Sequence, residues 1–361
     1  MKAAVLRGVD QPLEIEDVQI DKPRGREVLI RTAAAGVCHS DLHYQTGDYP
    51  CPMPTVLGHE SAGVVEQVGP DVTHVEPGDH VISCLSVFCG QCEYCLSGRP
   101  ALCTKVGLRR TPDQKPRLSD GKQEFHQFYD LSSFAEQMLV HENAIVKITK
   151  DMPLDRAALI GCGVTTGVGA VINTAKVAPG STVAIIGCGG IGLNCVQGAV
   201  LAGAGRIIAV DRVPAKLELA KKFGATDVVN ASDGDPVEQV KELTSGGVEY
   251  SFEAIGLKAT TEQAWSMLRI GGTATIIGMI PVGTMIEIHG VELLFEKKIQ
   301  GSMMGSNRFR IEMPRYVDLY LNGKLNLDDL VSQRIGLDQV QEGFEALKKG
   351  ELARSLIVLD T

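Results

Sequence analysis

Four cysteines gather between positions 89 and 103, in the pattern Cys89-x2-Cys92-x2-Cys95-x7-Cys103. In a reducing compartment, clustered thiols are more often metal ligands than disulfide partners. Four thiolates complete the tetrahedral shell of a zinc ion and leave no coordination position for water. The spacing therefore predicts a structural zinc site, with an iron–sulfur cluster or simply reduced thiols as the alternatives.

A glycine-rich turn follows the apolar segment 182–186 and opens an apolar helical pattern. In this context the first glycine makes a tight turn, the second admits a pyrophosphate, and the last lets the helix pack closely. The helix N-terminus presents free N–H groups to phosphate. An acid ending the next strand, nineteen residues after the turn, would accept hydrogen bonds from a ribose hydroxyl. The predicted dinucleotide-binding residues are Gly187, Gly189, Gly190, Ile191, Gly192 and Asp211. A glycine-rich turn in an unrelated α/β protein is the alternative.

The elements that position these residues fall into two kinds. Short β-branched runs within the first 150 residues predict a mostly antiparallel, barrel-like domain, for example 27–31, 61–68 and 79–82. From about 181, strands alternate with helices, which favours a parallel sheet covered on both faces. The predicted strands are 182–187, 206–211, 226–230, 248–256, 273–279 and 299–303. The predicted helices are 191–202, 214–223, 237–244, 261–268 and 291–295.

Two further segments show neither a clear strand pattern nor a clear helix pattern. The polar stretch 104–133 is interpreted as a long surface loop, and the pattern after about 305 as irregular chain returning to the first domain.

Composition narrows the functional classes. The 361 residues are 44% hydrophobic and 22% charged, which excludes a mainly disordered chain and suggests two domains. A net charge of −9 argues against nucleic acid or an anionic membrane as the main partner. With no signal-peptide core at the N-terminus and no uninterrupted apolar run of membrane-spanning length, a cytoplasmic protein is expected.

Five motifs occur in an order and spacing that resembles the zinc-dependent medium-chain alcohol dehydrogenases over essentially the whole chain. They are Gly36-Val-Cys-His-Ser-Asp-Leu-His43, Leu57-Gly-His-Glu-Ser-Ala-Gly63, the four-cysteine segment, Gly161-Cys-Gly-Val-Thr-Thr-Gly167 and the turn at 187–192. The resemblance implies an α/β architecture. A GroES-like β-barrel catalytic domain would span 1–163 and 305–361, and a Rossmann domain with a doubly wound parallel sheet would span 164–304.

The resemblance also implies a second zinc, so two Zn²⁺ per chain. Cys38, His59 and Cys162 would hold it and leave one position open for chemistry, the pattern for which alcohol dehydrogenase is itself the standard example. Asp41 is predicted to fix the tautomer of His59, and Glu60 to lie behind the metal. Simple solvation is the alternative for both acids.

Other roles carry over at matching positions. Ser40 and His43 would relay the released proton, because a histidine titrates near physiological pH; a surface histidine is the alternative. His39 and Arg354 would contact the pyrophosphate of NAD, and Thr166 would lie beside the nicotinamide.

Two cations near the predicted ribose site bear on the choice between NAD and NADP. Lys216 lies one helical turn beyond Asp211 and can reach the ribose. Arg212 could offer a guanidinium to a 2′-phosphate. We expect the Asp211 carboxylate to dominate and to select NAD.

The predicted function is reversible hydride transfer between NAD and a primary alcohol or aldehyde, of medium chain length or aromatic. The group with a long loop after the four-cysteine segment also includes glutathione- or mycothiol-dependent formaldehyde dehydrogenases. That activity, or nitrosothiol reduction, is the alternative and needs cations such as Arg109 and Arg110 in the pocket. A non-catalytic NAD-binding relative is a third possibility, against which the full ligand set argues. A homodimer is expected, paired through the strand 299–303, although tetramers also occur.

Overall fold

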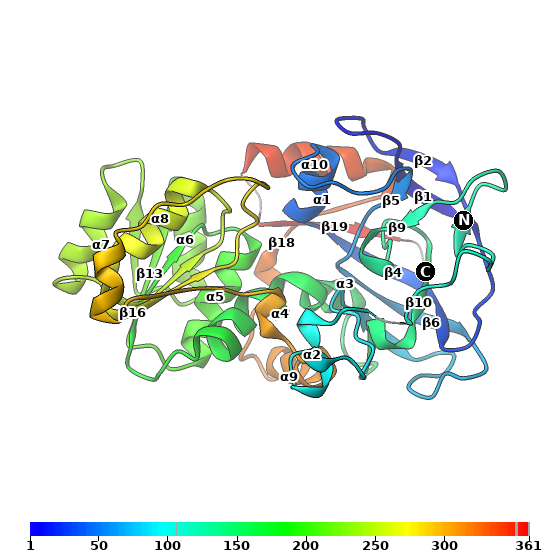
Figure 1. Ribbon diagram of the computed structural model, residues 1–361, viewed down its shortest axis with the longest axis horizontal. Coiled ribbons are helices and arrows are strands. Elements are labelled where there is room, and N and C mark those ends of the chain that lie inside the picture. Colours follow the sequence, from blue (N-terminus) through cyan, green and yellow to red (C-terminus); the bar gives the residue numbers. More distant parts are fainter. Residues whose placement is uncertain (106, 351–352, 360–361) are drawn as a thin grey trace. The chain divides into compact units, whose positions relative to one another are not determined.

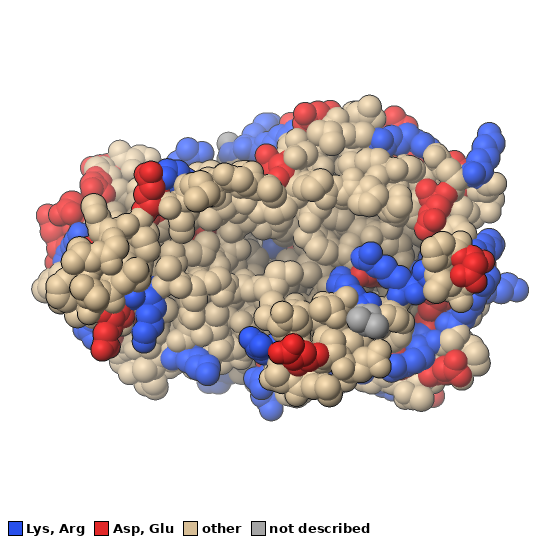
Figure 2. Space-filling model, viewed as in Figure 1, with Lys and Arg blue, Asp and Glu red and all other residues tan. Residues whose placement is uncertain are grey.

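The computed structural model describes residues 1–105, 107–350 and 353–359. The chain forms two compact units. One comprises Met1–Cys162 and Arg308–Thr361, and the other comprises Gly163–Asn307. Figure 2 shows acidic and basic side chains interspersed over the face it presents, in keeping with the modest net charge of −9.

The first unit is built on an antiparallel sheet with the order β11-β7-β6-β4-β19-β18, with β10 also paired to β4 (Figure 1). Only the β18–β19 pair in this sheet is parallel among the described residues. Two smaller sheets, with the orders β2-β1-β5-β9 and β3-β8, belong to the same unit. The strands of the first unit are β1 (Lys2–Leu6), β2 (Glu14–Asp17), β3 (Gln19–Ile20), β4 (Glu27–Val37), β5 (Thr55–Val56), β6 (Ser61–Val68), β7 (His80–Ser83), β8 (Leu118–Ser119), β9 (His126–Gln127), β10 (Gln137–His141), β11 (Ile145–Ile148), β18 (Val331–Ile335) and β19 (Arg354–Val358). The predicted barrel-like antiparallel domain is confirmed.

The first unit also contains α-helices and 3-10 helices. The α-helices are α1 (His39–Gln45), α2 (Glu93–Leu96), α3 (Leu154–Leu159), α9 (Phe309–Leu321) and α10 (Val340–Lys349). The 3-10 helices are η1 (Pro100–Leu102), η2 (Phe128–Asp130), η3 (Glu142–Ala144), η8 (Asp328–Leu330) and η9 (Leu337–Gln339).

The prediction of irregular structure after 305 is wrong. Helix α9 carries Pro314 in its interior, and this residue disguises the helical pattern. Helix α10 buries Val340, Phe344 and Leu347 at helical spacing in the core that also contains Phe134.

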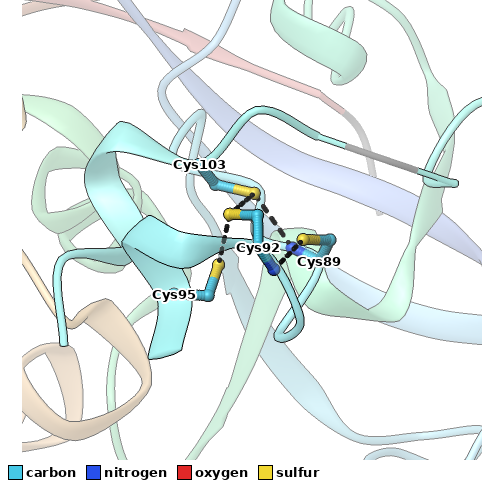
Figure 3. Close-up of side chains that lie close together, drawn as sticks. All are labelled: Cys89, Cys92, Cys95 and Cys103. Carbon is cyan, nitrogen blue, oxygen red and sulfur yellow. Dashed lines mark hydrogen bonds between the residues drawn. The ribbon is translucent and has the colours of Figure 1, made fainter. Parts of the chain in front are cut away.

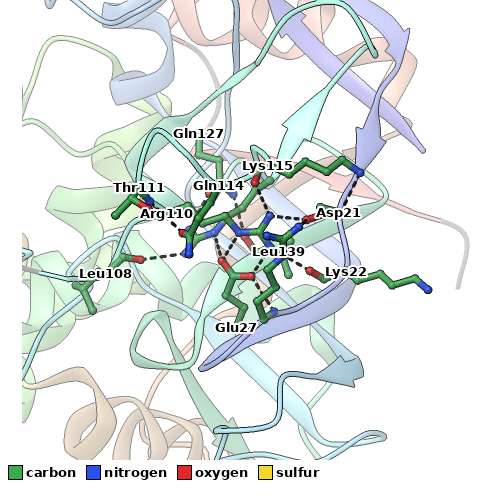
Figure 4. Close-up of polar contacts among 12 residues, drawn as sticks. Asp21, Lys22, Glu27, Leu108, Arg110, Thr111, Gln114, Lys115, Gln127 and Leu139 are labelled. Atoms are coloured by element: carbon green, nitrogen blue, oxygen red, sulfur yellow. Dashed lines mark hydrogen bonds and ion pairs between the residues drawn. The ribbon is translucent and has the colours of Figure 1, made fainter.

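The interpretation of 104–133 as a surface loop is correct for 111–115 and 121–124, which are exposed, but wrong for the buried parts of the segment; position 106 lies outside the described residues. Leu118, Phe125 and Phe128 are no more than 4% exposed. Two of its arginines are buried beside acids of the strand region rather than solvated (Figure 4). The segment is polar in composition, but its two buried arginines are neutralised by acids that are distant in the sequence.

Those partners form one network. Arg110 pairs with Asp21 at 2.6 Å and with Glu27 at 2.5 Å, and Arg117 pairs with Glu27 at 2.7 Å. Burial opposes ionisation of Glu27, but hydrogen bonds from the two arginines hold its pKa below the usual value. The network therefore anchors the segment to β4 through buried, mutually satisfied charges.

The second unit is a six-stranded parallel sheet with the order β14-β13-β12-β15-β16-β17 (Figure 1). Its strands are β12 (Thr182–Ile186), β13 (Arg206–Asp211), β14 (Asp227–Asn230), β15 (Val248–Glu253), β16 (Leu268–Ile276) and β17 (Lys298–Gly301). The helices are α4 (Thr165–Gly169), α5 (Gly190–Leu201), α6 (Pro214–Lys222), α7 (Pro236–Thr244), α8 (Lys258–Ser266), the π-helix η5 (Ala170–Ala175) and the 3-10 helices η6 (Gly290–Phe295) and η7 (Met304–Ser306). The doubly wound sheet is confirmed, with the predicted helix 291–295 corrected to a 3-10 helix.

A helical run missed by sequence reasoning extends from Leu154 to Ala175 and includes a π-helical stretch, η4 (Ile160–Val164). Among the described residues it alone is long and apolar enough to cross a membrane, but 83% of its most apolar window is buried, as expected for a helix of a protein core. The π turn matters because it carries Cys162.

Candidate active site

The four cysteines of the segment 89–103 converge around α2 and η1, with their sulfur atoms within 4.8 Å of one another (Figure 3). The Cys92 sulfur lies 3.5 Å from that of Cys95 and 3.8 Å from that of Cys103. Four thiolates bound at 2.3 Å to one tetrahedral zinc would lie about 3.8 Å apart. The set therefore fits a single zinc ion, whereas the thiolates of an iron–sulfur cluster are divided among two or four irons and would not all lie this close.

Backbone N–H groups point at these sulfurs. Cys89 and Lys105 each donate to the Cys103 sulfur at 3.1 Å, and Cys92 donates to the Cys89 sulfur at 3.3 Å. Donation of this kind stabilises a thiolate, and the Cys95 backbone N–H is the largest cause that lowers the pKa of Cys92 to about 5. Burial raises the pKa of Cys95 to about 12. The backbone donors thus favour a thiolate at Cys92, whereas burial favours the neutral thiol at Cys95.

Replacing Cys103 by serine should release about one zinc per chain and lower the unfolding temperature by about 5–15 °C, because metal binding free energy in such sites is folding free energy. Metal analysis and calorimetry measure both quantities. Cys51→Ser is the matched control, since Cys51 is a free thiol of the same unit outside both cysteine clusters. Unchanged zinc and unfolding temperature in the Cys103 variant would contradict a structural metal.

A second cluster joins residues far apart in the sequence. Cys38 directly follows β4 as the N-cap residue of α1, His59 lies between β5 and β6, and Cys162 lies in the π turn η4. All three belong to the first unit and are at most 4% exposed, and their ligand atoms lie within 4.8 Å of one another. A hydrogen bond between the two thiols lowers the pKa of Cys38 and raises that of Cys162.

Asp41 positions the residues of this cluster through hydrogen bonds. Its Oδ1 accepts hydrogen bonds from His59 Nδ1 and from the Gly58 N–H, both at 3.1 Å, and its Oδ2 accepts the Cys38 N–H at 3.2 Å. With its proton on Nδ1, His59 presents Nε2 as a lone pair, and that atom is buried without a hydrogen-bond partner. A buried nitrogen acceptor beside two thiols fits a zinc ion, whose bond would satisfy it.

Asp41→Asn should weaken zinc binding at this cluster about 10–100-fold, because the amide can no longer hold the His59 tautomer as an ionised carboxylate does. Competition with a zinc chelator, followed by counting the retained metal, measures the change. Asp48→Asn serves as the control, since Asp48 is paired to His43 instead. Equal zinc retention in the Asp41 variant and the wild type would show that Asp41 does not orient the ligand.

Glu60 and Arg354 form a buried pair beside the ligands. Arg354 Nη2 lies 3.3 Å from Glu60 Oε2, and both side chains are at most 5% exposed. Burial raises the pKa of Glu60 to about 7 against the opposing charge of Arg354. Arg354 was predicted to contact a pyrophosphate; the structure places it against Glu60, and its phosphate contact stays a prediction.

Helix α1 carries the predicted proton relay. The Ser40 hydroxyl lies 3.7 Å from the Cys38 sulfur, and His43 Nδ1 lies 2.9 Å from Asp48 Oδ2. His39 is exposed in the first turn of the same helix. Asp48 was missed by sequence reasoning, although an acid five residues beyond a candidate relay histidine was visible.

Two aromatic rings from η2 pack beside the ligand histidine and were also missed. Phe128 and Tyr129 each lie 5.7 Å from the His59 ring, and the Tyr129 hydroxyl is 2.9 Å from that of Tyr44. These aromatic residues border a cavity of about 400 Å³ that Lys105 and Arg109 also line. The cavity lies wholly within the first unit.

The second unit carries the glycine-rich turn as predicted, between β12 and α5. Gly187 has φ +92°, and a Cβ there would collide with Ile255. A Cβ on Gly192 would collide with the Gly187 carbonyl oxygen, which explains the close helix packing. At Gly189 the space where a Cβ would lie is open. Gly190 and Ile191 follow as the first residues of α5, so the turn leaves backbone N–H groups available to a phosphate.

Asp211 ends β13, next to β12 in the sheet, and is 9% exposed. Its Oδ2 accepts the Cys188 N–H at 2.8 Å and its Oδ1 accepts the Val213 N–H at 3.0 Å. Arg212 is exposed, and Lys216 lies in the first turn of α6. The acid therefore shapes the glycine-rich turn itself, while Arg212 extends toward solvent.

Thr166 lies on α4 and is 7% exposed. Its hydroxyl contacts the Met304 sulfur at 3.2 Å within the second unit. Its predicted place beside a nicotinamide stays a prediction.

An antiparallel barrel-like unit with a four-thiolate site and an open Cys2His cluster, joined in one chain to a dinucleotide-binding sheet, defines a zinc-dependent dehydrogenase. Residues 24–150 match the alcohol dehydrogenase GroES-like domain, and residues 190–322 match the zinc-binding dehydrogenase domain. The chain belongs to the zinc-dependent alcohol dehydrogenase family, whose members bind NAD(P).

Particular relatives are similar over their whole length. An S-(hydroxymethyl)glutathione dehydrogenase from Photobacterium damsela subsp. piscicida is 41% identical over 99% of both chains. An alcohol dehydrogenase class-3 from Oryza sativa subsp. japonica is 39% identical, over 99% of this chain and 97% of the relative. The crystal structure of benzyl alcohol dehydrogenase from Acinetobacter calcoaceticus has a TM-score of 0.94 at 36% identity and covers 99% of both chains.

Proposed function

We propose that this enzyme interconverts a primary alcohol and its aldehyde with NAD, at the cluster of Cys38, His59 and Cys162. The buried, unpartnered Nε2 of His59, held by Asp41 beside two thiols, carries the proposal. Oxidation converts the alcohol and NAD⁺ into the aldehyde, NADH and one proton.

Different residues of the chain have separate roles in this reaction. A zinc ion, when bound, supplies a Lewis acid toward the alcohol oxygen. Cys38, Cys162 and His59 hold it, and Glu60 with Arg354 forms a charged pair behind them. Ser40 accepts the alcohol proton and His43 passes it outward, with Asp48 holding the His43 ring at 2.9 Å.

For the cofactor, we propose NAD bound at the glycine-rich turn of the second unit. Gly187, Gly189 and Gly192 shape the turn, and the N-terminus of α5 faces the pyrophosphate. His39, Arg354 and Thr166 complete the proposed contacts. Asp211 faces the adenosine ribose, and Lys216 approaches the same ribose from α6.

The first candidate substrate is the hydroxymethyl adduct of glutathione, a thiol that carries two carboxylates. The name of the relative from Photobacterium damsela subsp. piscicida, at 41% identity, favours it. Arg109 supports it as well, because its side chain is 67% exposed at the 400 Å³ cavity, although its Nε pairs with Asp130 at 2.5 Å. Arg110 is 8% exposed and pairs with both Asp21 and Glu27. Of the two arginines, Arg109 is therefore the one proposed to meet a substrate carboxylate.

A benzylic primary alcohol is the second candidate. The rings of Phe128 and Tyr129 beside His59 offer an aromatic surface. The structural relative named benzyl alcohol dehydrogenase favours the same substrate class.

One assay separates the two candidates. NADH formation is followed with formaldehyde plus glutathione, with formaldehyde alone, and with benzyl alcohol. Activity that requires glutathione and falls in Arg109→Ala supports the first candidate. Efficient benzyl alcohol oxidation without any thiol supports the second, and no NADH from any of these mixtures would contradict the proposed dehydrogenase activity.

We also propose a cytoplasmic homodimer. Strand β17 is an edge strand of its sheet, and Leu293, Leu294 and Phe295 just before it are each at least 51% exposed. Pairing of two such edges would satisfy the open backbone groups and bury the apolar side chains. Light scattering distinguishes a dimer from a monomer or a tetramer.

A further inference from the structure

The turn that carries Tyr129 has an unusual backbone. Tyr129 has φ +51° and Asp130 has φ +63°, both in the left-handed region that residues with a Cβ avoid. Two consecutive residues of this kind persist only when the surrounding structure holds them. Something specific must therefore secure this turn.

Asp130 is the point of attachment. Its side chain is 8% exposed, its Oδ2 lies 2.8 Å from Lys105 Nζ, and its Oδ1 lies 2.5 Å from Arg109 Nε. On the other side, the Phe128 N–H donates to Ser132 Oγ at 2.9 Å. The Leu131 and Ser132 N–H groups also donate to the Phe128 carbonyl oxygen. The turn is thus held by a buried carboxylate between two cations and by several local hydrogen bonds.

Lys105 has a second attachment at its other end. Its backbone N–H donates to the Cys103 sulfur at 3.1 Å, in the four-cysteine site. One residue therefore bridges from a ligand of the proposed structural zinc to the Tyr129–Asp130 turn.

The turn also positions two aromatic rings, those of Phe128 and Tyr129, which we call the aromatic wall. Tyr129 and Phe128 meet the His59 ring edge to face at 5.7 Å each, and the Tyr129 hydroxyl is tied to Tyr44 at 2.9 Å. A displacement of the turn would move both rings relative to the ligand histidine and reshape the cavity that Tyr129 and Lys105 line.

We propose that Lys105 is a positioning residue. It links the four-cysteine lobe, residues 89–103, through Asp130 to the aromatic wall beside His59. Through this link, Lys105 sets which alcohols the site accepts. The proposal rests on the proposed function for its consequence in catalysis. It assigns the four-cysteine lobe a part in substrate selection in addition to stability.

The test compares Lys105→Met and Asp130→Asn with Lys147→Met. Lys147 pairs at 2.6 Å with the buried Asp79 in the same unit, so its variant is a matched loss of a lysine–aspartate pair. Hydrogen–deuterium exchange of the peptide 126–134 reports the turn directly. The ratio of kcat/KM for benzyl alcohol to that for ethanol reports the wall, and Lys105→Arg should restore both.

We expect faster exchange in 126–134 and a change of about 10-fold or more in the benzyl-to-ethanol ratio, since small misplacements near reacting groups have effects of up to about 100-fold. Lys147→Met should change neither. Unaltered exchange and ratio in Asp130→Asn, which removes both ion pairs and leaves every cysteine in place, would overturn the proposal. The same changes in Lys147→Met would overturn it too, because they would indicate general loosening.

Failure of the proposed function would look different. A wild-type chain that forms NADH neither from these alcohols nor from formaldehyde plus glutathione contradicts the dehydrogenase assignment, while the exchange measurement still decides whether Lys105 holds the turn. Should Lys105→Met lose zinc from the four-cysteine site, Asp130→Asn provides the decisive comparison.

Discussion

Replacing Cys38 by serine should lower the zinc content from two ions per chain to one and reduce kcat by about 10³-fold or more, while the chain stays folded. A metal Lewis acid contributes several kcal/mol to transition-state stabilisation, and each 1.36 kcal/mol is tenfold in rate. Cys38 supplies one of only three protein ligands, and its N–H is also fixed by Asp41 at 3.2 Å. Metal analysis and steady-state kinetics measure the two effects.

Controls keep these effects apart from general damage. Cys51→Ser removes a thiol of the same unit that belongs to neither cluster, and it should retain both zinc ions. Cys103→Ser should instead lose stability first. A Cys38 variant that keeps two zinc ions and full turnover would remove this cluster from the mechanism.

The second large effect concerns cofactor choice. Wild-type kcat/KM should favour NAD over NADP by about 10²-fold or more, and Asp211→Gly should bring the ratio near or below one. A 2′-phosphate beside the Asp211 carboxylate would juxtapose like charges at a cost of several kcal/mol, and each 1.4 kcal/mol is tenfold. Arg212 and Lys216 would remain as phosphate partners in the variant.

The structure adds a necessary control to this experiment. Asp211 also accepts the N–H groups of Cys188 and Val213, so the glycine variant loses turn contacts as well as charge. Asp211→Asn removes the charge and keeps one acceptor, and a shift shared by both variants isolates electrostatics. Wild-type efficiency with NADP equal to that with NAD would show that Arg212 controls the site.

Local signals made the second unit predictable. Strand β13 occupies Arg206–Asp211 as the sequence pattern predicted, because its apolar residues are contiguous and the strand is buried. The glycine turn was readable because φ +92° at Gly187 and the tight packing at Gly192 demand glycine at fixed spacing. Such requirements act within a few residues.

The site of the first unit was harder to predict from the sequence, because its residues are far apart along the chain. Cys38, His59 and Cys162 were singled out by family resemblance, since no local pattern joins them. Arg354 meets Glu60 across nearly three hundred residues.

The position of the aromatic wall could not be predicted from the sequence for a related reason. The polar appearance of 104–133 concealed charges that are neutralised within the fold, such as Asp130 between Lys105 and Arg109. Phe128 and Tyr129 acquire their place beside His59 only once that turn is held. Burial of paired charges cannot be inferred from composition alone.

Anomalous diffraction at the zinc edge, from crystals of the wild-type chain, locates each bound zinc ion. We expect two peaks, one among Cys89, Cys92, Cys95 and Cys103 and one among Cys38, His59 and Cys162. A single peak in the four-cysteine lobe, from protein grown with ample zinc, would contradict a catalytic zinc in this enzyme.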